Sequence, residues 1–116
     1  MKYQVIEEHK PNNSNPIKLR KGETIKLGRK SNEEDGWINW IYCYSLDGKG
    51  EGWTPVQIIQ IENEYGFVLN DYSAKELDVN KGDIVDGGIE LNGWLWCSRL
   101  NDFEMGWLPK EKMIEL

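Results

Sequence analysis

The chain has 116 residues, of which 39% are apolar and 11% aromatic, and its 20 Asp and Glu against 14 Lys and Arg give a formal charge of -6. That length suits one ordinary domain or two very small ones. The acidic total argues against general binding to nucleic-acid phosphates. No apolar stretch approaches the ~18 residues of a membrane span, and the apolar run in residues 1–5 is too short for a signal peptide. We therefore predict a soluble, cytoplasmic protein that binds neither nucleic acid nor membrane.

The residue inventory also restricts the chemistry. The chain has one histidine, His9, and two cysteines, Cys43 and Cys97, which is too few for the four nitrogen and sulfur ligands of a structural zinc ion. The glycine-rich run 48–52 lacks the spacing of a phosphate-binding loop and is typical of a hairpin turn. We expect a protein that is not an enzyme, with no catalytic residues, no metal and no cofactor. The cysteines are predicted to be free thiols that pack in the core.

The first half of the chain contains four short patterned segments. An opening segment covers residues 5–9, a segment with a K-G-E turn covers 17–23, an aromatic strand covers 39–43, and a G-W-T-P box covers 52–55. Alternation of residue classes at period 2, as in the aromatic strand, is typical of a β-strand with one buried face. No window sustains a helical period, and the best candidate, residues 109–113, is long enough for one 3₁₀ turn.

The second half repeats these segments in the same order, at residues 68–72, 77–83, 93–97 and 106–109. The offset between the copies is largest from Val5 to Val68, smaller from Ile17 to Leu77 and smallest from Trp40 to Trp94. These changes in offset place insertions in the first copy around 11–16 and within 29–39, as expected of loops. The chain is therefore an internal duplication.

The repeat predicts the domain organisation. We place the first copy at residues 1–61, a short linker at 62–66 and the second copy at 67–116. Both copies are predicted to be all-β, because their patterned segments alternate at period 2 and are separated by turn residues. At this size, closing a sheet into a barrel is a way to bury it and remove free edges. A five-residue linker spans about 12 Å on average, so we expect the copies to pack against each other.

The ordered motifs of the second copy resemble the signature of SH3 domains: the opening V-L-N-D-Y, the turn E-L-D-V-N-K-G-D, the aromatic G-W-L-W-C and the box G-W-L-P. The first copy resembles it more loosely, with His9 where a tyrosine is usual. The resemblance implies two small SH3-like β-barrels in tandem, of a bacterial variant type. In each, the W-x-x-C strand should be central and the proline of the G-W-x-P box should begin a 3₁₀ turn.

The resemblance also implies a site. In SH3 domains an aromatic groove binds proline-rich peptides in the polyproline II conformation. Carried over by position, the groove of the second copy consists of Tyr72, Trp94 and Pro109. The corresponding groove of the first copy consists of His9, Trp40 and Pro55, and is the weaker candidate. Two further tyrosine positions of the family hold Glu7 and Ile58 in the first copy and Asn70 and Lys112 in the second.

A second candidate surface follows from strand alternation. If Ile41 and Cys43 point inward, the aromatic rings between and beside them point outward; these are Trp40, Tyr42 and Tyr44, matched by Trp94 and Trp96 in the second copy. Outward aromatics in this number indicate either a contact surface or packing between the copies. Residues 62–116 hold twelve Asp or Glu and five Lys or Arg, which serves solubility or steers a basic ligand.

We therefore predict a module that binds a protein or peptide ligand, with basic residues in that ligand as one option, and that is a monomer or weak homo-oligomer. One alternative is a cell-wall or glycan-binding module, since exposed Trp and Tyr stack on sugars. A second is an accessory domain of an enzyme. A third is a methyl-lysine cage built from Trp37, Trp40 and Tyr42 near Glu34. The sequence alone leaves these open.

Overall fold

A computed structural model of the chain describes residues 1–11, 15–48 and 50–116. Within them the secondary structure is β-strand with three single-turn 3₁₀ helices. The strands are β1 (Lys2–Val5), β2 (Lys18–Leu19), β3 (Thr24–Lys30), β4 (Trp40–Ser45), β5 (Glu51–Pro55), β6 (Ile59–Glu62), β7 (Tyr65–Val68), β8 (Tyr72–Ser73), β9 (Ile84–Leu91), β10 (Trp94–Arg99), β11 (Met105–Pro109) and β12 (Met113–Glu115). The 3₁₀ helices are η1 (Glu33–Asp35), η2 (Val56–Ile58) and η3 (Lys110–Lys112). No helix in these ranges is long and apolar enough to cross a membrane.

The described strands form two antiparallel five-stranded sheets, neither of them closed, and a small two-stranded one. The first large sheet has the order β11-β10-β9-β1-β12 and the second has the order β5-β4-β3-β7-β6, while β2 pairs with β8. The chain divides into two compact units. Unit 1 consists of residues 1–14 and 75–116, and unit 2 consists of residues 15–74.

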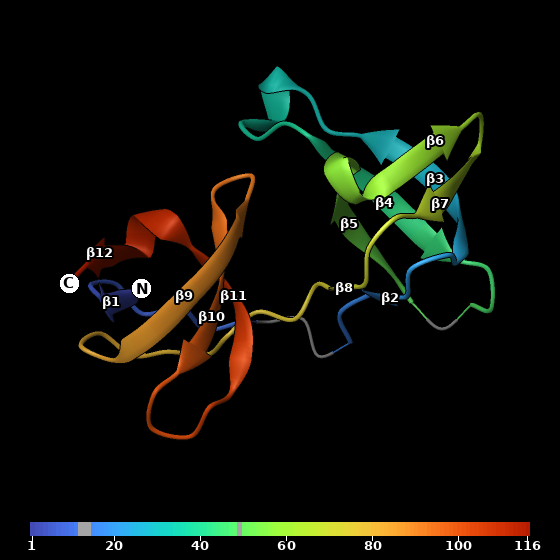
Figure 1. The fold of residues 1–116 in the computed structure, drawn as a ribbon. Coiled ribbons are helices and arrows are strands. Elements are labelled where there is room, and N and C mark those ends of the chain that lie inside the picture. The colour runs from blue at the N-terminus through green and yellow to red at the C-terminus, as the bar shows by residue number, and fades with distance from the viewer. Residues whose placement is uncertain (12–14, 49) are drawn as a thin grey trace. The chain divides into compact units, whose positions relative to one another are not determined.

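The two repeats exchange their opening strands. Figure 1 shows β1, at the blue end of the chain, beside the orange and red strands β9 and β12, while the yellow-green β7 lies between β3 and β6. The exchange is reciprocal and keeps the register. Tyr3 lies opposite Val85 in unit 1, and the residues that match them in the repeat, Gly66 and Ile25, lie opposite each other in unit 2. Each sheet therefore receives the other repeat's strand at the position where its own would fit.

The units consequently differ from the division expected from the repeat, 1–61 and 67–116. The opening arm of each copy, residues 1–14 and 65–74, lies in the unit of the other copy. Residues 62–66 do not link two units: β6 and β7 pair around a tight turn in which Asn63 has a φ of 59°. Asn tolerates this left-handed conformation at little cost, so the segment closes a hairpin.

Most local expectations are confirmed. The fold is all-β, and Pro55 and Pro109 precede η2 and η3. The W-x-x-C strands β4 and β10, however, lie second from one edge, and the middle strands are β3 and β9. The strands β3 and β9 lie in the middle because each is long enough to pair on both sides, with its hairpin partner on one side and with the exchanged strand on the other. The insertion expected around residues 11–16 lies partly outside the described residues.

Side-chain volumes explain why the strands are exchanged. In unit 1 the ring of Tyr3 packs on Gly87, where an added Cβ would lie 2.7 Å from Cε2 of the tyrosine. In unit 2 the sizes are reversed: Gly66 replaces the tyrosine and Leu27 replaces the glycine, with 3.0 Å between an added Cβ on Gly66 and Cδ2 of Leu27. Without exchange Tyr3 would meet Leu27, and Gly66 would meet Gly87. One unit would be overpacked and the other would contain a void.

The exchanged strands contribute to the cores. In unit 1, Val5 of β1 belongs to one buried cluster with residues of the second repeat, namely Leu77, Val79, Val85, Leu95, Cys97, Leu108 and Met113. In unit 2, Val68 of β7 is buried as deeply as Ile25 and Ile41 of the first repeat. Each core is thus assembled from both repeats.

Cys43 and Cys97 are free, fully buried thiols, as expected. Burial raises the pKa of Cys43 to about 11 and that of Cys97 to about 12. At pH 8 less than about one thiol in a thousand is therefore the reactive thiolate. We expect the native protein not to react measurably with a thiol reagent such as dithionitrobenzoate, and both thiols to react in denaturant. A fast phase of one or two thiols without denaturant would contradict this.

Candidate functional site

The strand exchange brings His9, not Tyr72, to Trp94. The imidazole of His9 and the indole of Trp94 meet edge to face with 5.7 Å between ring centroids. Trp94 begins β10 and is half-buried, and Pro109 lies opposite it at the end of β11. His9 is held by a backbone bridge to Val79, which fixes the arm that follows β1 against the second repeat.

Two charged side chains fix the orientation of the His9 ring. Lys112 Nζ lies 3.1 Å from His9 Nδ1, and because an ammonium group only donates, Nδ1 is the acceptor. His9 Nε2 therefore carries the proton and donates to Glu76 Oε1 at 2.6 Å. Lys112 also donates to the carbonyl of Glu8. We call this set, His9, Glu76, Trp94, Pro109 and Lys112, the His9 cluster. Its rings are preorganised, which lowers the entropy cost of binding.

The equivalent positions in unit 2 are Tyr72, Trp40 and Pro55. Tyr72 pairs with Leu19, as His9 bridges Val79, and Trp40 lies opposite Pro55 as Trp94 lies opposite Pro109. Tyr72 is buried, with 8% of its surface exposed. Its counterpart His9 is nearly as buried, with 12% of its side chain exposed, and Trp40 is half-buried like Trp94. Exposure therefore does not distinguish the two sets.

Each predicted groove set is thus divided between the units. His9 lies in unit 1 while Trp40 and Pro55 lie in unit 2, and Tyr72 lies in unit 2 while Trp94 and Pro109 lie in unit 1. Each unit still contains one opening-arm residue, one tryptophan and one proline. The opening-arm residue, however, comes from the other repeat. The sequence missed Glu76, which is the partner of His9, although an E-L opening of the turn segment is visible in it.

The outer face of unit 2 carries a second aromatic group. Trp53 makes edge-to-face contacts with Trp37 at 4.5 Å and with Tyr42 at 5.3 Å, and Tyr42 contacts Tyr44 at 5.2 Å. The alternation predicted for β4 is confirmed, since Ile41 and Cys43 are buried and Tyr44 is exposed. The outward rings of this strand therefore pack within their own unit.

A cation of the chain itself occupies this aromatic group. The guanidinium of Arg29 lies 5.1 Å from the centre of the Trp53 ring and is held by both carboxylate oxygens of Asp35, at 2.9 and 3.2 Å. Arg29 holds the pKa of Asp35 below its usual value. Asp35 belongs to η1, which lies in the inserted loop and is closed by a capping box with Asn32. Arg29 thus makes a cation–π contact with Trp53, a ring that is not part of the cage predicted from Trp37, Trp40 and Tyr42, which stays a prediction.

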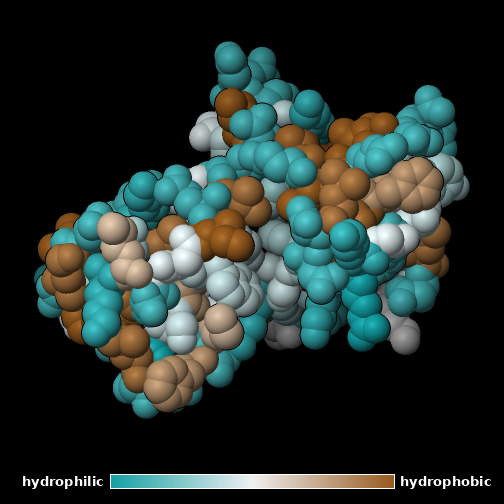
Figure 2. Space-filling model, in the orientation of Figure 1, coloured by the Kyte–Doolittle hydropathy of each residue, from teal (hydrophilic) through white to brown (hydrophobic). Residues whose placement is uncertain are grey.

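Tyr42 closes the other side of the group. Its hydroxyl donates to Glu51 Oε2 at 2.7 Å, and this carboxylate, with some burial, raises the pKa of Tyr42 to about 12. The hydroxyl therefore stays protonated at physiological pH. Trp37 and Tyr44 remain about two-fifths exposed. Figure 2 shows hydrophobic residues at the surface of both units, interspersed with hydrophilic ones.

A family model described as the variant SH3 domain matches residues 2–62, just over half of the chain. No curated protein and no solved structure matches the chain. The matched segment is one sequence repeat, so the strand β1 at its start lies in a different unit from the strands β3 to β6 that follow.

Proposed function

The chain belongs to the variant SH3 domain family, and from that premise we propose that it is a non-catalytic module that binds a peptide segment of a protein at the His9 cluster. The observation that carries the proposal is the contact of His9 with Trp94, next to Pro109. Through this contact, three residues at groove positions lie together in unit 1, although they belong to two different repeats. A proline-rich segment loses little entropy on docking against such rings.

Charge favours a ligand with a basic residue. Glu76 of the cluster is engaged by His9, and Glu90, which lies opposite Leu95 in the neighbouring strand, is engaged by Lys110 at 2.9 Å. The Glu90–Lys110 pair is about half exposed, so it contributes little stability and can exchange its lysine for a ligand cation. Such rim charges change the association rate and its salt dependence more than the affinity.

The test compares two equivalent tryptophans. We expect Trp94→Ala to weaken binding of an acetylated Arg-flanked Pro-x-x-Pro peptide about thirtyfold or more, the usual cost of truncating a central aromatic. Trp40→Ala, the equivalent change in unit 2, is the matched control and should alter the affinity little. Binding is measured by calorimetry, and circular dichroism checks that both variants fold. Loss on Trp40→Ala alone would place the site in unit 2.

A glycan ligand is the second candidate, and the exposure of Trp37 and Tyr44 favours it. Exposed rings that are fixed by neighbours stack on sugar faces, and Trp37 is fixed by Trp53. A chitin oligosaccharide therefore forms the second arm of the same titration. Saturable binding that is lost on Trp37→Ala and kept on Trp94→Ala would replace the peptide proposal.

A further inference from the structure

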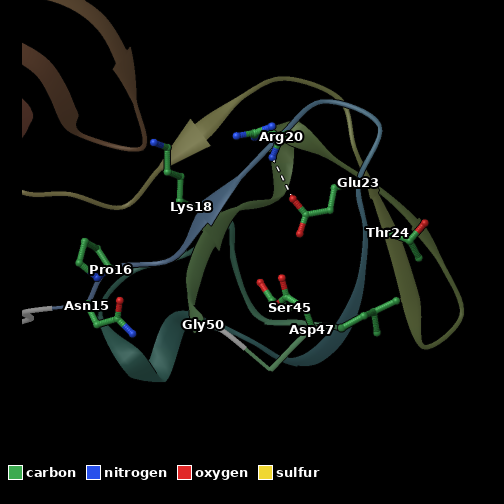
Figure 3. Close-up of a pocket in the computed structure, with 10 residues that line it drawn as sticks. Asn15, Pro16, Lys18, Arg20, Glu23, Thr24, Ser45, Asp47 and Gly50 are labelled. Atoms are coloured by element: carbon green, nitrogen blue, oxygen red, sulfur yellow. Dashed lines mark hydrogen bonds between the residues drawn. The ribbon is translucent and has the colours of Figure 1, made fainter.

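Unit 2 contains a polar pocket whose lining shares no residue with either groove set. It has a volume of about 600 Å³ and lies where β2, the start of β3 and the hairpin between β4 and β5 meet. The residues that give it charge are Lys18, Arg20, Glu23 and Asp47, and Thr24 and Ser45 complete its polar lining. Figure 3 shows the backbone N–H of Arg20 bound to the carboxylate of Glu23. That contact fixes the turn between β2 and β3.

Two cations at this pocket lack an acidic partner in the part of the chain that the structure describes. Lys18 and Arg20 are exposed on either side of the buried Leu19, so in an extended chain they lie on the same face. In Figure 3 both side chains extend to the same side of the pocket. Neither head group forms an ion pair or a side-chain hydrogen bond within residues 1–11, 15–48 and 50–116, although the protein as a whole is acidic.

The equivalent place in unit 1 shows what such a position requires. The repeat aligns Lys18 with the acidic Asp78 and Arg20 with the neutral Asn80. Lys10 from the exchanged arm donates to Asp78 Oδ1 at 2.6 Å and to Asn80 Oδ1 at 2.7 Å. Arg99 donates to the carbonyl of Asp78. The Asp78 carboxylate and the Asn80 amide oxygen are therefore both bound by Lys10 of the same chain.

Unit 2 has two cations at these positions, and among its described residues no acidic side chain pairs with them. Ser73 stands where unit 1 has Lys10, and Ser45 stands where it has Arg99. Neither serine is an anion, and the shorter side chain of Ser45 lines the pocket where its counterpart Arg99 reaches across to Asp78. In unit 1 this place is filled by side chains of the chain itself. In unit 2 the same place is a pocket with two cations at its edge.

We propose that this pocket binds the carboxylate of an acidic side chain in a peptide ligand. The guanidinium of Arg20 and the ammonium of Lys18 donate charge-assisted hydrogen bonds to it. Glu23 and Asp47 disfavour a doubly charged phosphate and accept N–H groups of the ligand backbone instead. The site shares no residue with the His9 cluster, so it stands or falls independently of the function proposed above.

The test uses the full chain and the peptide acetyl-Gly-Glu-Gly-amide, with acetyl-Gly-Gln-Gly-amide as its neutral match. In amide NMR spectra the Glu peptide should shift residues 18–24 and 45–48 saturably, and leave the equivalent residues 78–84 and 99–102 unmoved. Arg20→Gln should weaken this binding about tenfold, and Ser45→Arg, which copies Arg99, should block it. Lys26→Gln, an exposed lysine of β3 outside the pocket, is the control and should change nothing.

Three results would overturn the proposal. One is equal shifts with the Gln peptide, which would remove the role of the carboxylate. Another is binding that Arg20→Gln and Ser45→Arg leave unchanged, which would place the ligand elsewhere. The third is inorganic phosphate binding through the same residues as tightly as the Glu peptide, which would make the pocket a general anion site.

Discussion

Residues 15–74 expressed alone should fold, whereas residues 63–116, which contain the second repeat and the whole of β7, should not. The first fragment is continuous and contains every described strand of unit 2, including β7 and β8. The second lacks β1, which lies between β9 and β12 and is the only described strand that pairs with β12. If β7 took the place of β1, Gly66 would replace Tyr3 and leave a void beside Gly87. Tyr3 is partly buried against the core of unit 1, so its loss costs ~1–3 kcal/mol, a large fraction of the stability of a domain this small.

The measurement is circular dichroism with thermal unfolding of each fragment. Complementation supplies the matched control: a peptide of residues 1–14 added to fragment 75–116 should restore cooperative unfolding, because it brings Tyr3 and Val5 to the core. A peptide of residues 62–74 should restore it less well, since it offers Gly66 in place of Tyr3. A fragment 63–116 as stable as unit 1 in the intact chain would show that the exchange is dispensable.

Periodicity and repetition predict the local structure of this chain but not its pairing. Residues that the repeat aligns also occupy matching places in the strand registers. Tyr3 lies opposite Val85, and the residues aligned with them, Gly66 and Ile25, lie opposite each other. These registers are the same whether a strand joins its own repeat or the other one. Hydrogen bonding and alternation therefore cannot distinguish the two arrangements. The information lies in side-chain volume, in the pairs Tyr3 with Gly87 and Gly66 with Leu27.

The sequence predicts which residues take part in the candidate site, but not which of them lie together in one unit. Trp94, Pro109 and the position of His9 follow from the motifs, and the strand exchange decides which of them meet. The inserted loop offered a further signal: Asn32 followed three residues later by Asp35 is a capping box, which predicts the short helix η1. That Asp35 then holds Arg29 over Trp53 depends on where the loop returns, which no local pattern specifies.

The size rule predicts that the exchange can be reversed. In the double variant Tyr3→Gly with Gly66→Tyr, the new ring in β7 would collide with Leu27 in unit 2 as it stands, where even a Cβ on Gly66 meets Ile59 at 2.6 Å. Beside Gly87, in a sheet formed by the second repeat alone, the same ring fits the place that Tyr3 now occupies. We therefore expect each repeat of this variant to retain its own opening strand. Overpacking of the exchanged form costs ~1–3 kcal/mol, and the loss of the partly buried Tyr3 ring adds ~1–3 kcal/mol to that preference.

The readout is the nuclear Overhauser contacts of the ring introduced at position 66. Contacts to Gly87 and Leu95 show pairing within the repeat, and contacts to Leu27 and Ile59 show the exchanged form. Gly88→Ala is the matched control for added volume on β9, because a Cβ there meets only the carbonyl oxygen of Trp96 at 3.5 Å, and it should leave the exchange unchanged. If the double variant keeps the exchanged pairing with native stability, side-chain volume at these four positions does not determine it. The polar contacts of the exchanged arm, His9 with Glu76 and Lys10 with Asp78, would then be the next candidates, because the other arm has Tyr72 and Ser73 at these positions.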